Sequence, residues 1–227
     1  MISQPRRIRS YVLRQGRITP GQQQALERLT PKYCLDPATE IDVGDIFEKN
    51  SPLIVEIGFG NGASLAEVAE KTPETNFIGI EVHQAGVGHL MLELEHKQLT
   101  NVRIICHDAI EIVKTKFKAE SLDALWLFFP DPWPKKKHHK RRILNSDFIE
   151  IVTQKLKTGG YLHAATDWEP YAEQMLKVLQ ACPALKNQNK GYAKRPAHRP
   201  LTKFEKRGLN LGHQVRDLVF ERITGSC

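Results

Sequence analysis

The chain has 227 residues, with 33 lysines and arginines against 26 aspartates and glutamates, and a formal net charge of +7 at pH 7. Hydrophobic residues make up 41% and charged residues 26%, a balance that excludes a disordered, collagen-like or coiled-coil chain and predicts one globular unit. The longest apolar run, residues 124–130, is too short to span a membrane, and the arginine-rich start lacks the apolar stretch of a secretory signal. We therefore expect a soluble, cytoplasmic protein.

Short apolar runs alternate with helical periodicity from residue 52 onward. Helices are predicted after the first two runs and again at 146–157, where Gly159 and Gly160 should stop the helix, and at 167–180. Such alternation predicts an α/β fold with a doubly wound parallel sheet, whose ligands bind beyond the carboxyl ends of the strands. Residues 1–50 are interpreted as a basic arm and lead-in segment, and residues 51–227 as the domain. The predicted strands are residues 52–57, 76–81, 102–106, 122–129 and 161–166.

The four cysteines lie far apart and form no C-x-x-C pair. Neither a zinc site nor a disulfide framework is indicated, and reduced thiols are expected in a cytosolic protein. The cysteines are Cys34, Cys106, Cys182 and Cys227.

Lysine and arginine gather in three blocks of the sequence. Residues 1–17 hold five arginines and no acid, residues 135–142 (KKKHHKRR) hold six cations, and residues 186–207 hold eight cations and one acid. The rest of the chain is net acidic. Basic blocks on an acidic body are typical of proteins that bind a polyanion, so nucleic acid is the expected partner. His138 and His139 lie among cations that would repel a metal ion, and no metal site is expected.

A glycine-rich turn, EIGFGNG, separates the first predicted strand from the first helix. Glycine lets the backbone turn tightly and approach a ligand without an intervening side chain. Gly58, Gly60 and Ala63 also fit the dinucleotide fingerprint, so an NAD(P)-dependent dehydrogenase is one alternative. However, the carboxylate of Glu56 stands just before the glycines and favours a cationic ligand such as S-adenosylmethionine over a pyrophosphate.

Acidic residues follow three successive predicted strands. Glu56, Glu81 and Asp108 stand where hydrogen-bond acceptors for one adenosyl ligand would be needed. After the fourth strand comes the peptide FPDPWP, in which prolines on both sides of Asp131 fix the backbone. Such rigidity suits a carboxylate that must hold a planar base.

The peptides EIGFGNG, GIEVH, FPDPWPKKKHHKRR, TDWEPYAEQM and RPLTKFEKRG, in this order and spacing, resemble the bacterial tRNA (guanine-N7)-methyltransferase family. The resemblance runs from about Arg9 to the C-terminus. It implies a class I S-adenosylmethionine-dependent methyltransferase fold, with an antiparallel last strand near residues 215–222. It also implies methyl transfer from that cofactor to N7 of a guanosine in the variable loop of tRNA.

The resemblance also assigns roles to individual residues. Asp131 would be catalytic and would contact the cofactor together with Glu56, Gly58, Gly60, Glu81 and Asp108. The substrate guanosine would be bound by Lys135, Asp167, Thr202, Lys203, Phe204 and Glu205. The RNA-contacting loop would comprise Lys137, His138, His139, Lys140, Arg141 and Arg142.

Two further interpretations stay open at this point. D-P-P-W-like turns also serve amine nucleophiles, so another RNA or DNA amino-methyltransferase would fit. A non-catalytic RNA-binding protein that retains the fold is the other alternative. The sequence does not distinguish a monomer from a homodimer.

Overall fold

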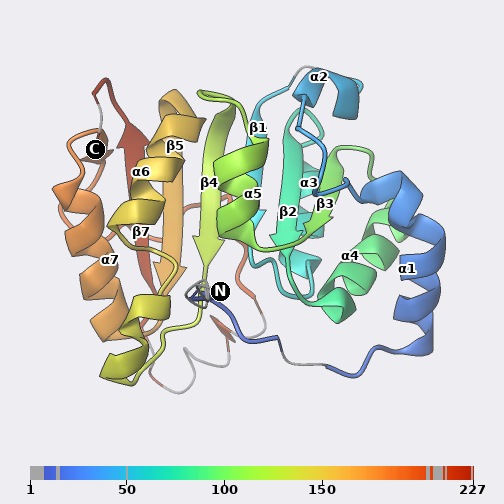
Figure 1. Cartoon of the computed structure of the whole chain (residues 1–227), viewed down its shortest axis with the longest axis horizontal. Helices are drawn as coiled ribbons and strands as arrows, with labels where there is room; N and C mark the ends of the chain where they lie inside the picture. The colour runs from blue at the N-terminus through green and yellow to red at the C-terminus, as the bar shows by residue number, and fades with distance from the viewer. Residues whose placement is uncertain are drawn as a thin grey trace, which may run out of the picture.

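The computed structural model describes residues 8–13, 16–49, 51–202, 205–206, 212, 214–225 and 227. Within these residues, a seven-stranded sheet of order β3-β2-β1-β4-β5-β7-β6 forms the centre of the molecule (Figure 1). Strands β1 to β5 are parallel, and β7 runs antiparallel to both β5 and β6. The strands are β1 (Leu53–Ile57), β2 (Asn76–Glu81), β3 (Val102–Cys106), β4 (Leu122–Phe128), β5 (Leu156–Thr166), β6 (Leu185–Asn187) and β7 (Arg216–Arg222).

Helices cover both faces of the sheet and form two separate hydrophobic cores. One core contains α1 (Pro20–Tyr33), α3 (Ala63–Lys71) and α4 (Gln84–His96). The other contains α5 (Ala109–Lys116), α6 (Ser146–Lys155) and α7 (Glu169–Ala181), which lie in front of the sheet in Figure 1. Because both faces are covered, β2 and β4 can be apolar almost throughout, which is why their sequences read as continuous apolar runs. The predicted doubly wound sheet with an antiparallel last strand is confirmed.

Helix α1, which the periodicity analysis did not identify, lies within the basic lead-in segment. Thr19 and Gln22 form a capping box at its start, and Pro20 occupies the first turn. Its buried residues Leu29 and Tyr33 belong to the core shared with α4. The short helix α2 (Val43–Ile46) follows it and packs against the opposite core.

The prediction that Gly159 and Gly160 stop the helix of residues 146–157 is wrong. Helix α6 ends at Lys155, and β5 begins at Leu156. The two glycines lie in an irregularity of β5, where the register against β4 shifts. A Cβ on Gly160 would come within 2.9 Å of the Asp123 carbonyl oxygen, so the close approach of two strands explains this glycine.

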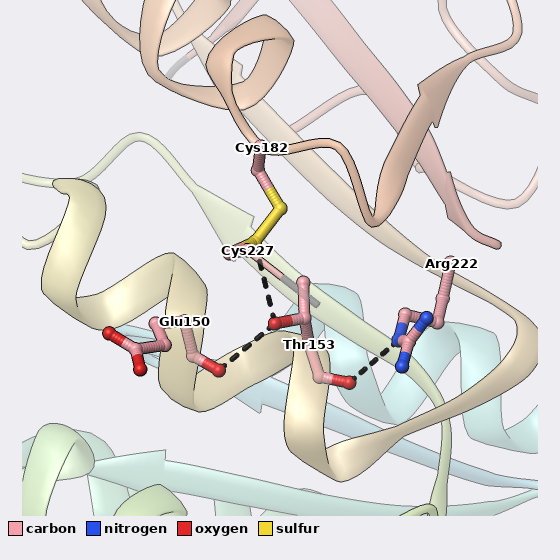
Figure 2. Close-up of a disulfide and its surroundings, with 5 residues drawn as sticks. All are labelled: Glu150, Thr153, Cys182, Arg222 and Cys227. Atoms are coloured by element: carbon pink, nitrogen blue, oxygen red, sulfur yellow. Dashed lines mark hydrogen bonds between the residues drawn. A yellow bond between two sulfur atoms is a disulfide. The ribbon is translucent and has the colours of Figure 1, made fainter. Parts of the chain in front are cut away.

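Two of the four cysteines are bonded to each other, which corrects the prediction of reduced thiols. A disulfide joins Cys182, directly after α7, to the terminal Cys227 (Figure 2). Strand β7 returns the chain end to α7 and brings these residues, 45 apart in sequence, to a Cα–Cα distance of 4.8 Å. Thr153 of α6 lies beside Cys227, and its carbonyl oxygen accepts a hydrogen bond from Arg222. Cys34 and Cys106 are free.

None of the helices in the described ranges combines the length and the hydrophobicity that crossing a membrane requires.

Candidate active site

Three adjoining cavities, lined by described residues, lie along the carboxyl edge of the parallel strands. The edge cavity, about 330 Å³, includes Asp108; the central cavity, about 190 Å³, includes Glu81 and Asp131; the wide cavity, about 810 Å³, includes Glu56. His107 lines both the edge and central cavities, and Gly58 lines both the central and wide ones. The three adjoining cavities, together called the groove, include all four acids that were predicted to contact the cofactor.

The glycine-rich turn lies between the central and wide cavities. Gly58 and Gly60 have φ values of 71° and 62°, in the left-handed region that favours glycine. A Cβ on either residue would meet no atom within 4 Å, whereas a Cβ on Gly86 of α4 would lie 2.0 Å from the Gly60 carbonyl oxygen. The turn is thus held against α4 on one side and leaves open space on the other.

The carboxylate of Glu81 fixes this turn to the end of β2. It accepts hydrogen bonds from the backbone N–H groups of Gly60 at 3.1 Å, Val82 at 2.7 Å and His83 at 3.1 Å. Glu81 is 7% exposed and lines the central cavity. A carboxylate held by three backbone donors is rigid and retains acceptor capacity for a ligand hydroxyl.

Glu56, at the end of β1, is 5% exposed and lines the wide cavity. Burial, and then the charge of Glu81, raise the pKa of Glu56 to about 8. The residue is therefore largely protonated at neutral pH until a cation approaches it. Perturbed carboxyl groups in a groove are characteristic of functional sites.

Asp108 caps the N-terminus of α5, and its side chain accepts a hydrogen bond from the Ile110 N–H at 3.0 Å. The preceding residue, His107, has a buried Nδ1 atom that finds no hydrogen-bond partner among the described residues. Buried polar atoms in proteins normally have a hydrogen-bond partner. A polar ligand bound in the adjoining cavity can supply the hydrogen bond that this nitrogen lacks.

The proline-rich turn after β4 is strained on both sides of Asp131. Phe129 and Trp133 have φ values of 50° and 46°, a conformation that side chains other than glycine rarely adopt. Such residues cost about 1–3 kcal/mol each and tend to cluster at active sites. The exposed Asp131 lines the central cavity, and Phe129 lines both the central and wide cavities.

The basic segment that follows folds into the 3-10 helix η1 (Lys136–Arg141). Lys135, Lys137, His139 and Lys140 are exposed. His138 and Arg141 are half-buried and pack against the ring of Trp133, with the Arg141 guanidinium 4.8 Å from its centroid. The exposed side chains are therefore the ones available to a polyanion.

The prediction that Arg142 contacts RNA does not fit its position. Its side chain is 3% exposed and lies over the ring of Tyr171. The guanidinium donates to the Pro132 carbonyl oxygen and to Gln174 Oε1, each at 2.9 Å. Arg142 thus fastens the proline-rich turn to α7, which leaves little of its side chain accessible to RNA.

One member of the predicted guanosine-binding group, Thr202, lines the wide cavity. Its Oγ1 accepts the Glu205 N–H at 3.0 Å. The Glu205 carboxylate is 3% exposed and accepts two hydrogen bonds from Arg199, so it faces this arginine. Asp167 is half-buried just after β5, whereas Lys203 and Phe204 lie outside the described residues.

Sequence reasoning missed residues that line the site from distant segments. Ser10 and Tyr11 line the central cavity, and Arg199 lines the wide one. Trp126, in the middle of β4, also reaches the wide cavity. Trp126 was missed because an apolar residue in β4 fits an ordinary buried strand. Arg199 was missed because it lies within the basic residues 186–207, which fit an ordinary surface block.

This fold and this groove define a class I methyltransferase. Solved structures with the same fold include the 16S rRNA methyltransferase KamB, with a TM-score of 0.61, 12% identity and coverage of 82% of this chain and 95% of that one. The antibiotic-resistance methyltransferase Kmr has a TM-score of 0.56, 15% identity and coverage of 85% and 95%. At such identities the likeness concerns the fold alone.

Residues 50–218 match the family described as "Putative methyltransferase". The tRNA (guanine-N(7)-)-methyltransferase of Paraburkholderia xenovorans is 50% identical over 218 residues, which cover 96% of this chain and 84% of that protein. The protein of the same description from Shewanella pealeana is 52% identical over 221 residues, covering 96% and 93%. The chain belongs to the tRNA (guanine-N7)-methyltransferase family.

Proposed function

We propose that this protein transfers a methyl group from S-adenosylmethionine to N7 of a guanosine in the variable loop of tRNA. Its relatives of that description match almost the whole chain at about 50% identity. The observation that carries the assignment of roles is that Glu81, the last residue of β2, and Asp131, in the turn after β4, line one cavity. Family membership excludes the nicotinamide-dependent alternative.

The residues of the groove fit the cofactor. Gly58 and Gly60 leave open space where a Cβ would project, and the buried Nδ1 of His107 needs a polar partner. Glu81 and Asp108 would accept hydrogen bonds from the adenosyl hydroxyl and amino groups. When bound, the cofactor supplies an electrophilic methyl group on a sulfonium. Glu56, close enough to Glu81 to interact electrostatically, would attract the positive part of the ligand.

The reaction depends mainly on the alignment of the guanine N7 with the methyl group of the cofactor. Guanine N7 carries an in-plane lone pair, so no protein base has to remove a proton from the nucleophile. Holding both reactants in near-attack geometry can contribute about 7–11 kcal/mol. The strained turn around Asp131 is suited to this task because its backbone is fixed by prolines and by the anchoring of Arg142.

A carboxylate selects guanine and stabilises the product. Asp131, or Asp167 after β5, would accept hydrogen bonds from the N1 and N2 donors, which only guanine presents together. The same negative charge would stabilise the positive charge that develops on the methylated ring. Lys135, exposed four residues after Asp131 in the chain, would meet O6 or a phosphate.

The exposed cations of η1 would bind the tRNA backbone. A base in the variable loop is partly stacked, so it has to be drawn out at a cost of about a few kcal/mol, which phosphate contacts can offset. Because the substrate is tRNA, we expect the enzyme to act in the cytoplasm.

Product analysis tests this function directly. The protein is incubated with bulk unmodified tRNA and methyl-labelled S-adenosylmethionine, and the RNA is digested to nucleosides. We expect the label in 7-methylguanosine. Label in N6-methyladenine or N2-methylguanine would favour an amino-methyltransferase, and no label would favour a non-catalytic RNA-binding protein.

A further inference from the structure

A chain of polar side chains, all buried except the half-buried His198, connects β5, β7 and the segment that walls the wide cavity. His163 of β5 is fully buried; its Nε2 lies 2.8 Å from Asp217 Oδ1, and its Nδ1 lies 2.9 Å from His198 Nε2. Arg199 donates to Asp217 at 2.7 and 2.9 Å and to Glu205 at 2.7 and 2.9 Å. Every member thus has a partner of matching chemistry.

The direction of each hydrogen bond follows from these partners. A carboxylate can only accept, so His163 Nε2 carries the hydrogen that points to Asp217. Burial lowers the pKa of His163, which keeps the ring neutral and leaves Nδ1 as an acceptor. His198 must then donate from Nε2. Burial, and then His163, lower the pKa of His198 to about 4, so it too is neutral at physiological pH.

The His198 ring is also held by stacking. It lies parallel to the indole of Trp126, with centroids 5.1 Å apart and an interplanar angle of 13°. Trp126 is 2% exposed, lies in the middle of β4 and donates its Nε1–H to the Tyr161 hydroxyl at 3.3 Å. His198 is therefore anchored to the sheet by its hydrogen bond to His163 and by ring contacts with Trp126, Tyr161 and His163.

The anchored residue directly precedes a wall of the wide cavity. Residues 199–202 all line that cavity, together with the glycine-rich turn and Glu56. The Arg199 guanidinium lies 5.6 Å from the centroid of Phe129, at the boundary with the central cavity. A displacement of His198 would therefore shift residues 199–202 relative to the strained turn that contains Asp131.

We propose that His198, through His163 and Asp217, is a positioning residue that fixes residues 199–202 as the wall against which the substrate guanosine is oriented. This inference rests on the proposed function of the groove. His198 itself does not line any of the three cavities. Its loss should impair the orientation of the base, while the phosphate contacts and the cofactor site remain.

Two variants at the same position test the proposal. His198→Phe keeps a flat ring for stacking on Trp126 but removes the donor to His163. His198→Gln retains an amide N–H at about the place of Nε2. The exposed His96, at the end of α4, provides the control variant His96→Gln. For each protein we would measure kcat and KM with tRNA, the Kd of S-adenosylhomocysteine, and tryptophan emission.

We expect His198→Phe to lower kcat by about 10- to 100-fold, because small errors in alignment are costly. The KM for tRNA should change less than threefold and the cofactor Kd less than twofold. His198→Gln should restore kcat to within about fivefold of the parent, and tryptophan emission should shift more in the Gln variant, which loses the ring stacked on Trp126, than in the Phe variant, which keeps one. His96→Gln should match the parent.

The outcomes separate the two claims. If the parent makes 7-methylguanosine and His198→Phe keeps its kcat within twofold, the positioning role is refuted. A parallel loss of cofactor affinity, or a Gln variant no better than Phe, would also refute it, since either result indicates general destabilisation. If the parent methylates no guanine at N7, the proposed function fails instead.

Discussion

The indole of Trp133 donates its Nε1–H to the carbonyl oxygen of Ser10 at 3.2 Å, joining residues 123 apart in the chain. Ser10 and Tyr11 line the central cavity together with Glu81 and Asp131. Figure 1 shows the start of the described chain at the lower edge of the sheet, below β4, where the parallel strands end. The strained turn thus holds the N-terminal segment over the cavity where we place the cofactor.

Replacing Trp133 by Phe tests this attachment. The substitution keeps an aromatic ring for Arg141 and His138 but removes the donor to Ser10. One hydrogen bond contributes about 0.5–1.5 kcal/mol, so the Kd of S-adenosylhomocysteine should rise about 2- to 10-fold. Isothermal calorimetry measures the change, and Trp168→Phe, at the 40% exposed N-cap residue of α7, is the control. Equal affinity in both variants would argue against the attachment.

Asp131→Asn should abolish most of the methyl transfer. The change keeps the size of the side chain and removes the charge that would stabilise the methylated base, so we expect kcat to fall at least about a hundredfold. Binding of tRNA, measured by filter retention, should stay within about threefold. Glu150→Gln, at an exposed position of α6, should leave both unchanged. A modest decrease in kcat would shift the catalytic role towards Asp167.

The exposed cations of η1 should determine the salt dependence of tRNA binding. Combining Lys137→Ala with Lys140→Ala should weaken binding and flatten the plot of log affinity against log salt by about one unit per lost phosphate contact. Cofactor affinity should not change. A double variant of Lys114 and Lys177, exposed on α5 and α7 away from the basic blocks, should keep the parental slope.

Arg142→Ala provides a contrast within the same run of cations. It leaves the Pro132 carbonyl and Gln174 without their donor, so it should lower the melting temperature and affect activity through the turn. A variant that melts like the parent and only loses salt dependence would restore the predicted RNA contact.

Glu56 should make stability depend on pH. Its pKa of about 8 in the folded protein lies above that of the unfolded chain, so the folded state holds the extra proton. This contribution to stability is fully present below about pH 4 and is lost as the pH rises towards 8. Glu56→Gln should remove that part of the decline in melting temperature between pH 5 and 8. Identical profiles for the two proteins would contradict the raised pKa.

The same group should couple cofactor binding to proton release. A cation near Glu56 favours its ionised form, so S-adenosylmethionine should release a proton at pH 7. Calorimetry in buffers of different ionisation enthalpy detects this release. In Glu56→Gln the observed enthalpy should not depend on the buffer in this way.

The Cys182–Cys227 disulfide should stabilise the protein without affecting catalysis. It lies at the edge of the sheet opposite the groove, near the label C in Figure 1. Closing a loop of this length typically contributes about 2–4 kcal/mol, so Cys227→Ser should lose that amount in urea unfolding. Cys182→Ser should behave identically, and reductant should bring the parent to the same stability. A parent unaffected by reductant would contradict this contribution.

The sequence by itself indicated the five parallel strands of the sheet and the motifs that follow them. A strand buried on both faces has to be apolar throughout, so β2 and β4 were visible as runs, and the bounds of β2 and β3 agree with the expected ones. The glycines of the turn and the prolines around Asp131 restrict the conformation of their own backbone. Such local effects can be predicted from the sequence without a structure.

Tertiary structure decided everything that depends on residues distant in the chain. Lys140 and Arg142 are two residues apart in one basic run, yet the first is exposed and the second is enclosed by α7. The pairing of Cys182 with Cys227 and of His163 with His198 depends on how β7 and residues 196–202 return to the sheet. Neither composition nor periodicity records such contacts, because they are set by the packing of separate elements.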